Sequence, residues 1–270
     1  MDAGGVYTYL EAQDPTLTGT FVEIDGISTF YEGDGSGEPL LLLHGGMCSA
    51  ETFDRMIPGL AGSYQVFAPE RRGHGRMPDT AEPFSYDAMT VDTVAFMDAL
   101  GLASAHVIGH SDGANIGLLM AIRHPSRVRR LVSISGNFRT GDSDDVPSRP
   151  RAAMDTTADA LEDDYRRLSP DGPEHLAVIW AKLEPMWNDW TGIALEALRS
   201  ITAPTLVMAA DEDVIGLEQT IDLYRSLELG QLAIIPNTSH NLIRERGELI
   251  DELILDFLAD PGLPVDSPGG

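Results

Sequence analysis

Ser111 stands in a sequence context typical of a reactive serine. It occupies the centre of Gly109-His-Ser-Asp-Gly113, directly after a β-rich run at 105–108 and directly before an apolar helical segment at 114–122. A Gly-x-Ser-x-Gly motif in this position predicts a sharp strand-to-helix turn that holds the serine hydroxyl clear of the strand. The following helix directs its first N–H groups and the positive end of its dipole at the same point. We therefore predict that Ser111 is a nucleophile.

A nucleophilic serine needs a base and an acid, and both follow other predicted strands. Three acidic residues at 211–213 come after one apolar run, and His240 comes after the next. Parallel strands of an open α/β sheet end at one edge, so these side chains are expected to meet Ser111 there. The imidazole would take the hydroxyl proton, and a carboxylate would fix its tautomer and stabilise the imidazolium.

Short apolar runs alternate with helical patterns along most of the chain. Asp25-Gly26 separates the first two runs and predicts a tight hairpin. The remaining alternation predicts a mainly parallel, doubly wound sheet of the α/β class. The predicted strands are 20–24, 27–31, 40–43, 64–68, 105–108, 128–135, 204–209 and 231–235, and the predicted helices are 52–60, 85–100, 114–122, 217–227 and 249–258. The last helix is expected to bury one apolar face, made of Leu249, Ile250, Leu253, Ile254, Phe257 and Leu258.

From about residue 20 to 258 the sequence resembles the α/β-hydrolase superfamily. Besides the serine motif, it carries a His-Gly turn at His44, an Arg-Gly-His-Gly turn at 72–75, a strand-end acid and a Ser-His pair near the C-terminus. The resemblance implies an eight-stranded, mainly parallel sheet flanked by helices, with a small helical cap and no cofactor. Ser-Asp-Gly at the elbow and the stretch 169–175 are similar to valacyclovir-hydrolase-like esterases.

The resemblance also implies roles for three residues. Ser111 would be the nucleophile, His240 the general base and acid, and Asp213 the orienting carboxylate. Asp211 is the alternative acid, because Ala210 stands where the family usually has glycine.

An oxyanion hole is implied by the same resemblance. Its donors would be the backbone N–H groups of Asp112 and Gly46, with Met47 as the alternative to Gly46. The Asp112 side chain leaves two interpretations open. Its carboxylate either lies near the substrate and favours an ammonium group, or faces away and pairs with an arginine or a backbone donor.

The sequence predicts four segments. Residues 1–19 form a loose arm, 20–139 and 201–260 form the core, 140–200 form an inserted helical cap, and 261–270 form a flexible tail. The cap has apolar residues at helical spacing. They either pack the cap onto the core or line a substrate pocket; the pocket candidates are Met154, Tyr165, Trp180 and Trp187.

Composition limits the classes of partner. The chain has 43 acidic and 18 basic residues, a formal net charge of −25, which disfavours nucleic acid and anionic membranes. A single cysteine, Cys48, excludes an internal disulfide, and no secretory signal or membrane-spanning run is expected, so we predict a cytoplasmic protein. No spacing typical of metal ligands occurs, and the expected partner is a small molecule. The oligomeric state is not predicted.

Together these features predict a serine hydrolase. Its expected substrate is a small, partly apolar carboxylic ester, cleaved through an acyl-enzyme. The same triad would also serve a lactonase, an amidase, a C–C bond hydrolase or a cofactor-free haloperoxidase or perhydrolase. A ligand receptor that kept the fold without turnover is the non-catalytic alternative.

Overall fold

The computed structural model describes residues 19–139 and 153–261, with side chains in the second range described from Ala160 onward. The predicted arm up to residue 18, the segment 140–152 and the tail from 262 lie outside the described residues. The core is one eight-stranded sheet in the order β1-β2-β4-β3-β5-β6-β7-β8. Its strands are β1 (Thr20–Ile24), β2 (Ile27–Gly35), β3 (Glu38–Leu43), β4 (Tyr64–Pro69), β5 (Ala105–His110), β6 (Val128–Ile134), β7 (Thr205–Ala210) and β8 (Gly230–Ile235).

Only β2 runs against its neighbours. It pairs antiparallel with β1 and with β4, whereas β3 to β8 pair in parallel. The predicted Asp25-Gly26 hairpin joins β1 to β2, and both residues have the positive φ values, 50° and 84°, that a tight hairpin turn requires. The expectation of a mainly parallel sheet is therefore confirmed.

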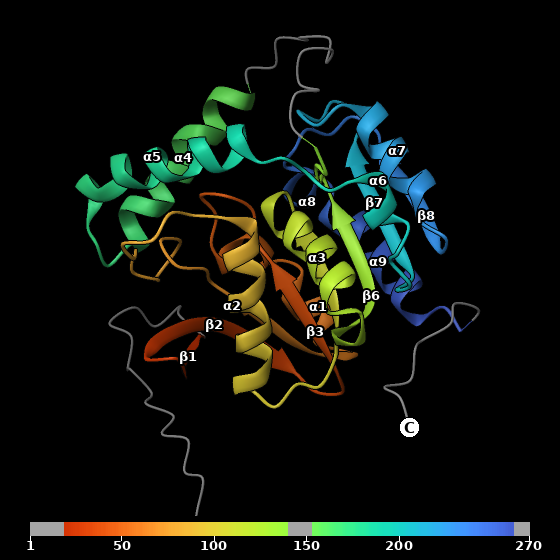
Figure 1. Cartoon of the computed structure of the whole chain (residues 1–270), viewed down its shortest axis with the longest axis horizontal. Coiled ribbons are helices and arrows are strands. Elements are labelled where there is room, and N and C mark those ends of the chain that lie inside the picture. Colours follow the sequence, from red (N-terminus) through yellow and green to blue (C-terminus); the bar gives the residue numbers. More distant parts are fainter. Residues whose placement is uncertain (1–18, 140–152, 262–270) are drawn as a thin grey trace, which may run out of the picture.

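Helices cover both faces of the sheet, as Figure 1 shows. Because side chains alternate along a strand, Leu41 and Leu43 of β3 join one apolar layer and Leu40 and Leu42 join the other. The helical segments are η1 (Ala50–Phe53), α1 (Ile57–Leu60), α2 (Tyr86–Ala99), α3 (Asp112–Arg123), η2 (Pro125–Arg127), α4 (Ala153–Leu168), η4 (Pro173–His175), α5 (Leu176–Asp189), α6 (Leu195–Leu198), α7 (Leu217–Ser226), α8 (Leu242–Glu245) and α9 (Gly247–Ala259).

Two local predictions were wrong. The helix expected at 52–60 is split into η1 and α1, because Pro58 fits only the first turn of a helix and ends any helix that reaches it from the N-terminal side. Leu249 was expected on the buried face of α9 but is 41% exposed. Ile250 and Ile254, one turn apart, carry that face instead.

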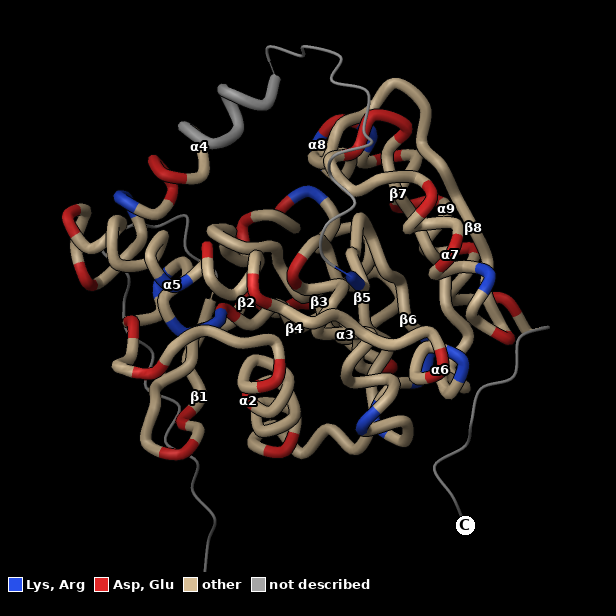
Figure 2. The backbone as a smooth tube through the Cα atoms, turned by 45° about the horizontal axis from the view of Figure 1, so that its top comes forward, with Lys and Arg blue, Asp and Glu red and all other residues tan. Residues whose placement is uncertain are grey.

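The helices α4 and α5 lie beside the edge toward which β3 and β6 point (Figure 1). Pro185 does not end α5, which continues to Asp189. The division between core and cap stays a prediction. Acidic positions are spread over the outer helices and loops, so the excess negative charge is not gathered in one patch (Figure 2). Among the helices of the described residues, none has the length and apolar content needed to cross a bilayer.

Candidate active site

Ser111 sits at the junction of β5 and α3 in a strained backbone conformation. Its φ is 54° and its ψ is −118°, a region that residues with a side chain rarely adopt. The turn is possible because glycines flank it. A Cβ on Gly113 would overlap the carbonyl oxygen of Leu43, and one on Gly109 would overlap the carbonyl oxygen of Gly113. The sharp elbow predicted from the motif is present.

The structure brings Ser111, His240 and Asp213 together from three strand ends. The Nε2 atom of His240 lies 2.9 Å from Ser111 Oγ, and its Nδ1 atom lies 2.7 Å from Asp213 Oδ1. With the proton on Nδ1, the ring donates to Asp213 and accepts the hydroxyl of Ser111. This is the hydrogen-bond chain that activates a serine.

Asp213, rather than Asp211, contacts the imidazole. Its carboxylate is buried and also accepts hydrogen bonds from the Ser135 hydroxyl and from the N–H of Ile215. Asp211 instead accepts from the N–H of Thr238 at 3.1 Å, which ties the β7 loop to the β8 loop.

The electrostatics of the pair favour an ionised Asp213. Burial by itself raises the pKa of Asp213, but the charge and hydrogen bond of His240 outweigh it and hold the pKa at about 2. Burial likewise lowers the pKa of His240, and the charge and hydrogen bond of Asp213 more than reverse this, so the pKa lies above its usual 6.5. Asp213 is therefore an anion that stabilises positive charge on the ring.

The Asp112 side chain lies against the backbone of Gly46, the other residue expected to supply an oxyanion donor. A Cβ on Gly46 would be 2.5 Å from the Oδ2 atom of Asp112. Within residues 19–139 and 153–261, no hydrogen bond engages the backbone N–H of Gly46 or of Asp112. Met47, the alternative donor, has a φ of 58° and buries its side chain in the core. In the same part of the chain, no group of three or more His, Cys, Asp or Glu side chains could hold a metal ion.

Residues 40–252 match the model of the alpha/beta hydrolase family. The chain belongs to this family. It is 30% identical over 259 residues to the 2-hydroxymuconate semialdehyde hydrolase of Pseudomonas sp. (strain CF600), which covers 87% of this chain and 92% of that protein. It is 28% identical over 274 residues to the putative carbamate hydrolase RutD of Caulobacter sp. (strain K31), with 92% and 98% covered.

A solved structure of similar fold is the meta-cleavage product hydrolase of Pseudomonas fluorescens IP01. Its TM-score is 0.76 at 22% identity, and the match covers 88% of this chain and 96% of that one. This likeness shows the fold alone. The named relatives act on different bonds, so membership supports a hydrolase and leaves its substrate open.

In this hydrolase the Asp112 carboxylate has partners that neither interpretation expected. It is 3% exposed and accepts hydrogen bonds from the Tyr86 hydroxyl at 2.7 Å and from the indole N–H of Trp187 at 3.1 Å. It lies against the backbone of Gly46, the residue predicted to supply an oxyanion donor. Within the described part of the chain, its hydrogen-bond donors are thus aromatic side chains, neither arginine nor backbone.

Of the three predicted pocket residues whose side chains are described, only Trp187 contacts Asp112 and Gly46. Trp180 packs against Trp187, with ring centroids 5.9 Å apart, and donates to Glu162. Tyr165 is buried in the apolar layer. The side chain of Met154 lies outside the described residues.

Sequence reasoning missed three residues that touch the site: Tyr86, Ser135 and Arg71. Ser135 could have been found, because it follows a buried strand at the same edge as the triad. The ring of His110, beside the proposed nucleophile, donates to the carbonyl of His240 at 2.9 Å. Burial, together with the charge of His240, lowers the pKa of His110 to about 4, so this ring stays neutral.

Proposed function

We propose that this alpha/beta hydrolase cleaves a small, partly apolar carboxylic ester through an acyl-enzyme on Ser111. The observation that carries the proposal is the unbroken hydrogen-bond chain from Asp213 through His240 to Ser111, with links of 2.7 and 2.9 Å. The 2.9 Å link is within reach for proton transfer from Ser111 to His240, and the 2.7 Å link orients the ring.

In the first half-reaction, Ser111 Oγ attacks the ester carbonyl while its proton moves to His240 Nε2. The N–H groups of Gly46 and Asp112 stabilise the resulting oxyanion. Asp213 stabilises the imidazolium, which then gives its proton to the departing alcohol. The products of this step are the free alcohol and an ester on Ser111.

In the second half-reaction, His240 removes a proton from water, and the hydroxide attacks the acyl-enzyme. The proton returns to Ser111 Oγ as the carboxylic acid leaves. The free enzyme is regenerated without any oxidant, reductant or cofactor. Trp187 supports an apolar acyl group, because its indole borders the turn that holds the oxyanion.

A second candidate is hydrolysis of a C–C bond. It is favoured by the 30% identity to a 2-hydroxymuconate semialdehyde hydrolase over most of both chains. Both candidates use the same serine and histidine, so site variants alone do not separate them.

A substrate panel separates the two candidates. We would compare kcat/KM for 4-nitrophenyl acetate, butyrate and hexanoate, for a γ-lactone, for an anilide and for 2-hydroxymuconate semialdehyde. The proposal predicts the highest kcat/KM on an ester, and a loss of at least about 1,000-fold in the Ser111→Ala variant. A higher value on the semialdehyde would replace the ester proposal with C–C hydrolysis, and an active Ser111→Ala variant would remove both.

A further inference from the structure

Arg71 is a buried arginine that holds the turn after β3. Only 8% of its surface is exposed. Its Nη1 donates to the carbonyl of His44 at 2.6 Å, and its Nη2 donates to the carbonyl of Gly45 at 2.8 Å. Both carbonyls belong to the short turn that also presents Gly46.

The carbonyl of Gly45 and the N–H of Gly46 belong to one peptide unit. The described chain has no cis peptide bond, and in a trans peptide the C=O and the N–H point in opposite directions. The same carbonyl also accepts from His44 Nδ1 at 2.8 Å and from the Cys48 N–H at 3.3 Å, and Arg71 adds a charged donor to these two neutral ones. Holding the Gly45 carbonyl therefore fixes the Gly46 N–H on the opposite side. A charge-assisted bond to the carbonyl also polarises the peptide, which makes the N–H a stronger donor.

The charge of Arg71 has a second consequence at the same place. The Asp112 carboxylate lies 2.5 Å from the Cβ position of Gly46, and a fixed anion there opposes an oxyanion. Burial lowers the pKa of Arg71, and the nearby charge of Asp112 raises it. His44 and His74 lie in the two turns next to Arg71. Burial is the largest cause that lowers the pKa of each ring, and the charge of Arg71 is the second. Arg71 is thus the cation that offsets Asp112.

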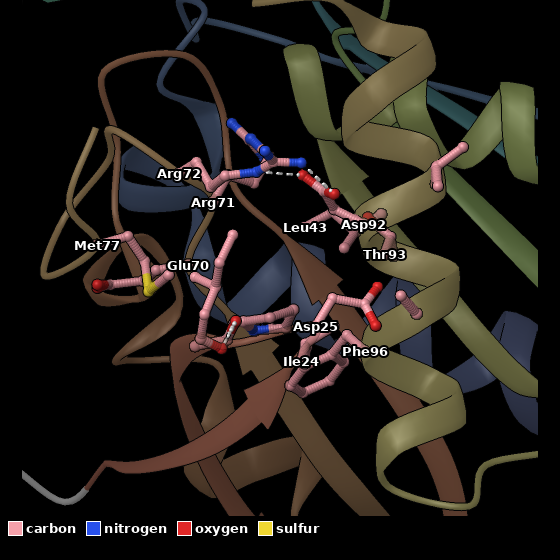
Figure 3. A pocket seen from close by; sticks show the side chains of 15 residues that line it. Ile24, Asp25, Leu43, Glu70, Arg71, Arg72, Met77, Asp92, Thr93 and Phe96 are labelled. Atoms are coloured by element: carbon pink, nitrogen blue, oxygen red, sulfur yellow. Dashed lines mark hydrogen bonds and ion pairs between the residues drawn. The ribbon is translucent and has the colours of Figure 1, made fainter. Parts of the chain in front are cut away.

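The next residue in the chain is a natural control. Arg72 pairs with Asp92 through Nε at 2.9 Å and Nη2 at 2.5 Å (Figure 3). Among the described residues, its side-chain hydrogen bonds go to α2 and none goes to the turn at 44–47. Arg72 is therefore also an arginine that follows β4, but it does not contact the turn at 44–47, which presents the Gly46 N–H.

We propose that Arg71 is a positioning residue of this hydrolase, which aims the Gly46 N–H at the oxyanion by holding the Gly45 carbonyl. The inference rests on the proposed serine mechanism and adds a residue that acts through the backbone. Arg71 does not touch the substrate, so it affects the transition state more than the bound substrate.

The first test compares Arg71→Met, Arg71→Lys and Arg72→Met on 4-nitrophenyl butyrate. Loss of one oxyanion donor typically costs on the order of 100-fold in rate, so Arg71→Met should lower kcat by about that factor with KM within about threefold. Arg71→Lys keeps the charge but cannot donate to both carbonyls with a planar guanidinium, and it should retain about a tenth of the parent kcat. Arg72→Met should stay within about threefold of the parent.

A transition-state analogue gives a readout that a general loss of structure would not mimic. A trifluoromethyl ketone forms a tetrahedral oxyanion on serine, so its affinity for Arg71→Met should fall by the same factor as kcat. Butyrate, the product, needs no oxyanion, and its inhibition constant should not change. Equal losses for both ligands would contradict a role specific to the oxyanion.

Chemical rescue keeps the test decisive if Arg71→Met folds poorly. Arg71 also lines a cavity of about 200 Å³ between the β1–β2 hairpin and α2 (Figure 3), which gives a small cation a route to the vacated position. In Arg71→Ala, millimolar guanidinium should restore kcat at least about tenfold, and methylammonium at the same ionic strength should not.

The possible failures are distinguishable. A parent-like kcat in Arg71→Lys, or a folded Arg71→Met within about threefold of the parent, overturns the inference. The serine mechanism survives that result as long as Ser111→Ala is inactive. An active Ser111→Ala variant overturns the mechanism, whatever Arg71 does.

Discussion

The indole N–H of Trp187 is shared by both oxygens of the Asp112 carboxylate, at 3.1 Å to each. This contact joins α5 to the residue that follows the proposed nucleophile. The same indole would stand 2.6 Å from a Cβ on Gly46. Trp187 therefore lies beside the turn at 44–47, which holds the proposed oxyanion donor Gly46.

Replacing Trp187 should change acyl-group selectivity. Trp187→Ala removes the ring that borders the turn, so the ratio of kcat/KM for 4-nitrophenyl hexanoate to that for the acetate should rise about tenfold, the low end of the effect of one methylene in an apolar pocket. Trp187→Phe keeps most of the ring and should keep most of the selectivity. The ratio cancels differences in folded fraction. Val178→Ala, at an exposed site on α5, is the control, and an equal ratio in all four proteins would exclude the role.

The rate should depend on the ionisation of His240. The neutral ring is the base, so kcat/KM should rise with pH through a pKa above 6.5. Asp213→Asn removes the charge that raises this pKa and the acceptor that fixes the tautomer. The acidic limb should move to lower pH, and kcat should fall by on the order of 10,000-fold. The check is a pH–rate profile from pH 5 to 9, and an unmoved acidic limb in Asp213→Asn would assign it to another group.

Glu32 should make the protein less stable as the pH rises. It is 7% exposed, and burial, followed by the charge of Asp54, raises its pKa from 4.5 to about 7. The unfolded chain loses this proton near pH 4.5 while the folded protein keeps it to about pH 7, so stability is lost across that interval. A shift of this size corresponds to roughly 1–3 kcal/mol.

Glu32→Gln removes that titration while keeping a hydrogen-bond donor toward Asp54. Its free energy of unfolding should therefore fall less than that of the parent between pH 5 and pH 8, by roughly 1–3 kcal/mol. Urea unfolding at the two pH values measures the difference. Glu23→Gln, at an exposed position of β1, should follow the parent. Parallel behaviour of Glu32→Gln and the parent would show that Glu32 titrates normally.

The close approach at the elbow can be tested with a single methyl group. Gly113→Ala places a Cβ on the carbonyl oxygen of Leu43, which is backbone and has no room to move. We expect a loss of about 2–4 kcal/mol in unfolding free energy. Gly247→Ala, where a Cβ meets nothing within 4 Å, should change it by less than about 1 kcal/mol. Similar stabilities of the two variants would contradict the tight packing of the turn.

The features of the fold that depend on local sequence patterns were predicted from the sequence. The sheet, the hairpin and the positions of Ser111, His240 and the acidic group at 211–213 follow from apolar runs, turn residues and the rule that groups gather at strand ends. The choice of Asp213 within that group came from the family resemblance. Their catalytic roles stay proposals. Pro58 also carried a local signal, and the predicted helix at 52–60 ignored it.

Contacts between distant segments carried no such signal. Tyr86 lies 26 residues from Asp112, and neither helical nor strand periodicity indicates that its hydroxyl reaches the elbow. In the sequence, Arg71 is a residue that follows a predicted strand, with no sign of its partner. Its hydrogen bond to a turn 26 residues earlier depends on how β4 lies beside β3. Such partners require the packed structure.

The identity of the nucleophile is tested most directly by labelling with a fluorophosphonate, followed by peptide mass spectrometry. If Ser111 is the nucleophile, we expect one adduct, on Ser111, with labelling abolished in Ser111→Ala and slowed at least about 1,000-fold in His240→Ala. An adduct on any other residue, or undiminished labelling of Ser111→Ala, would contradict it.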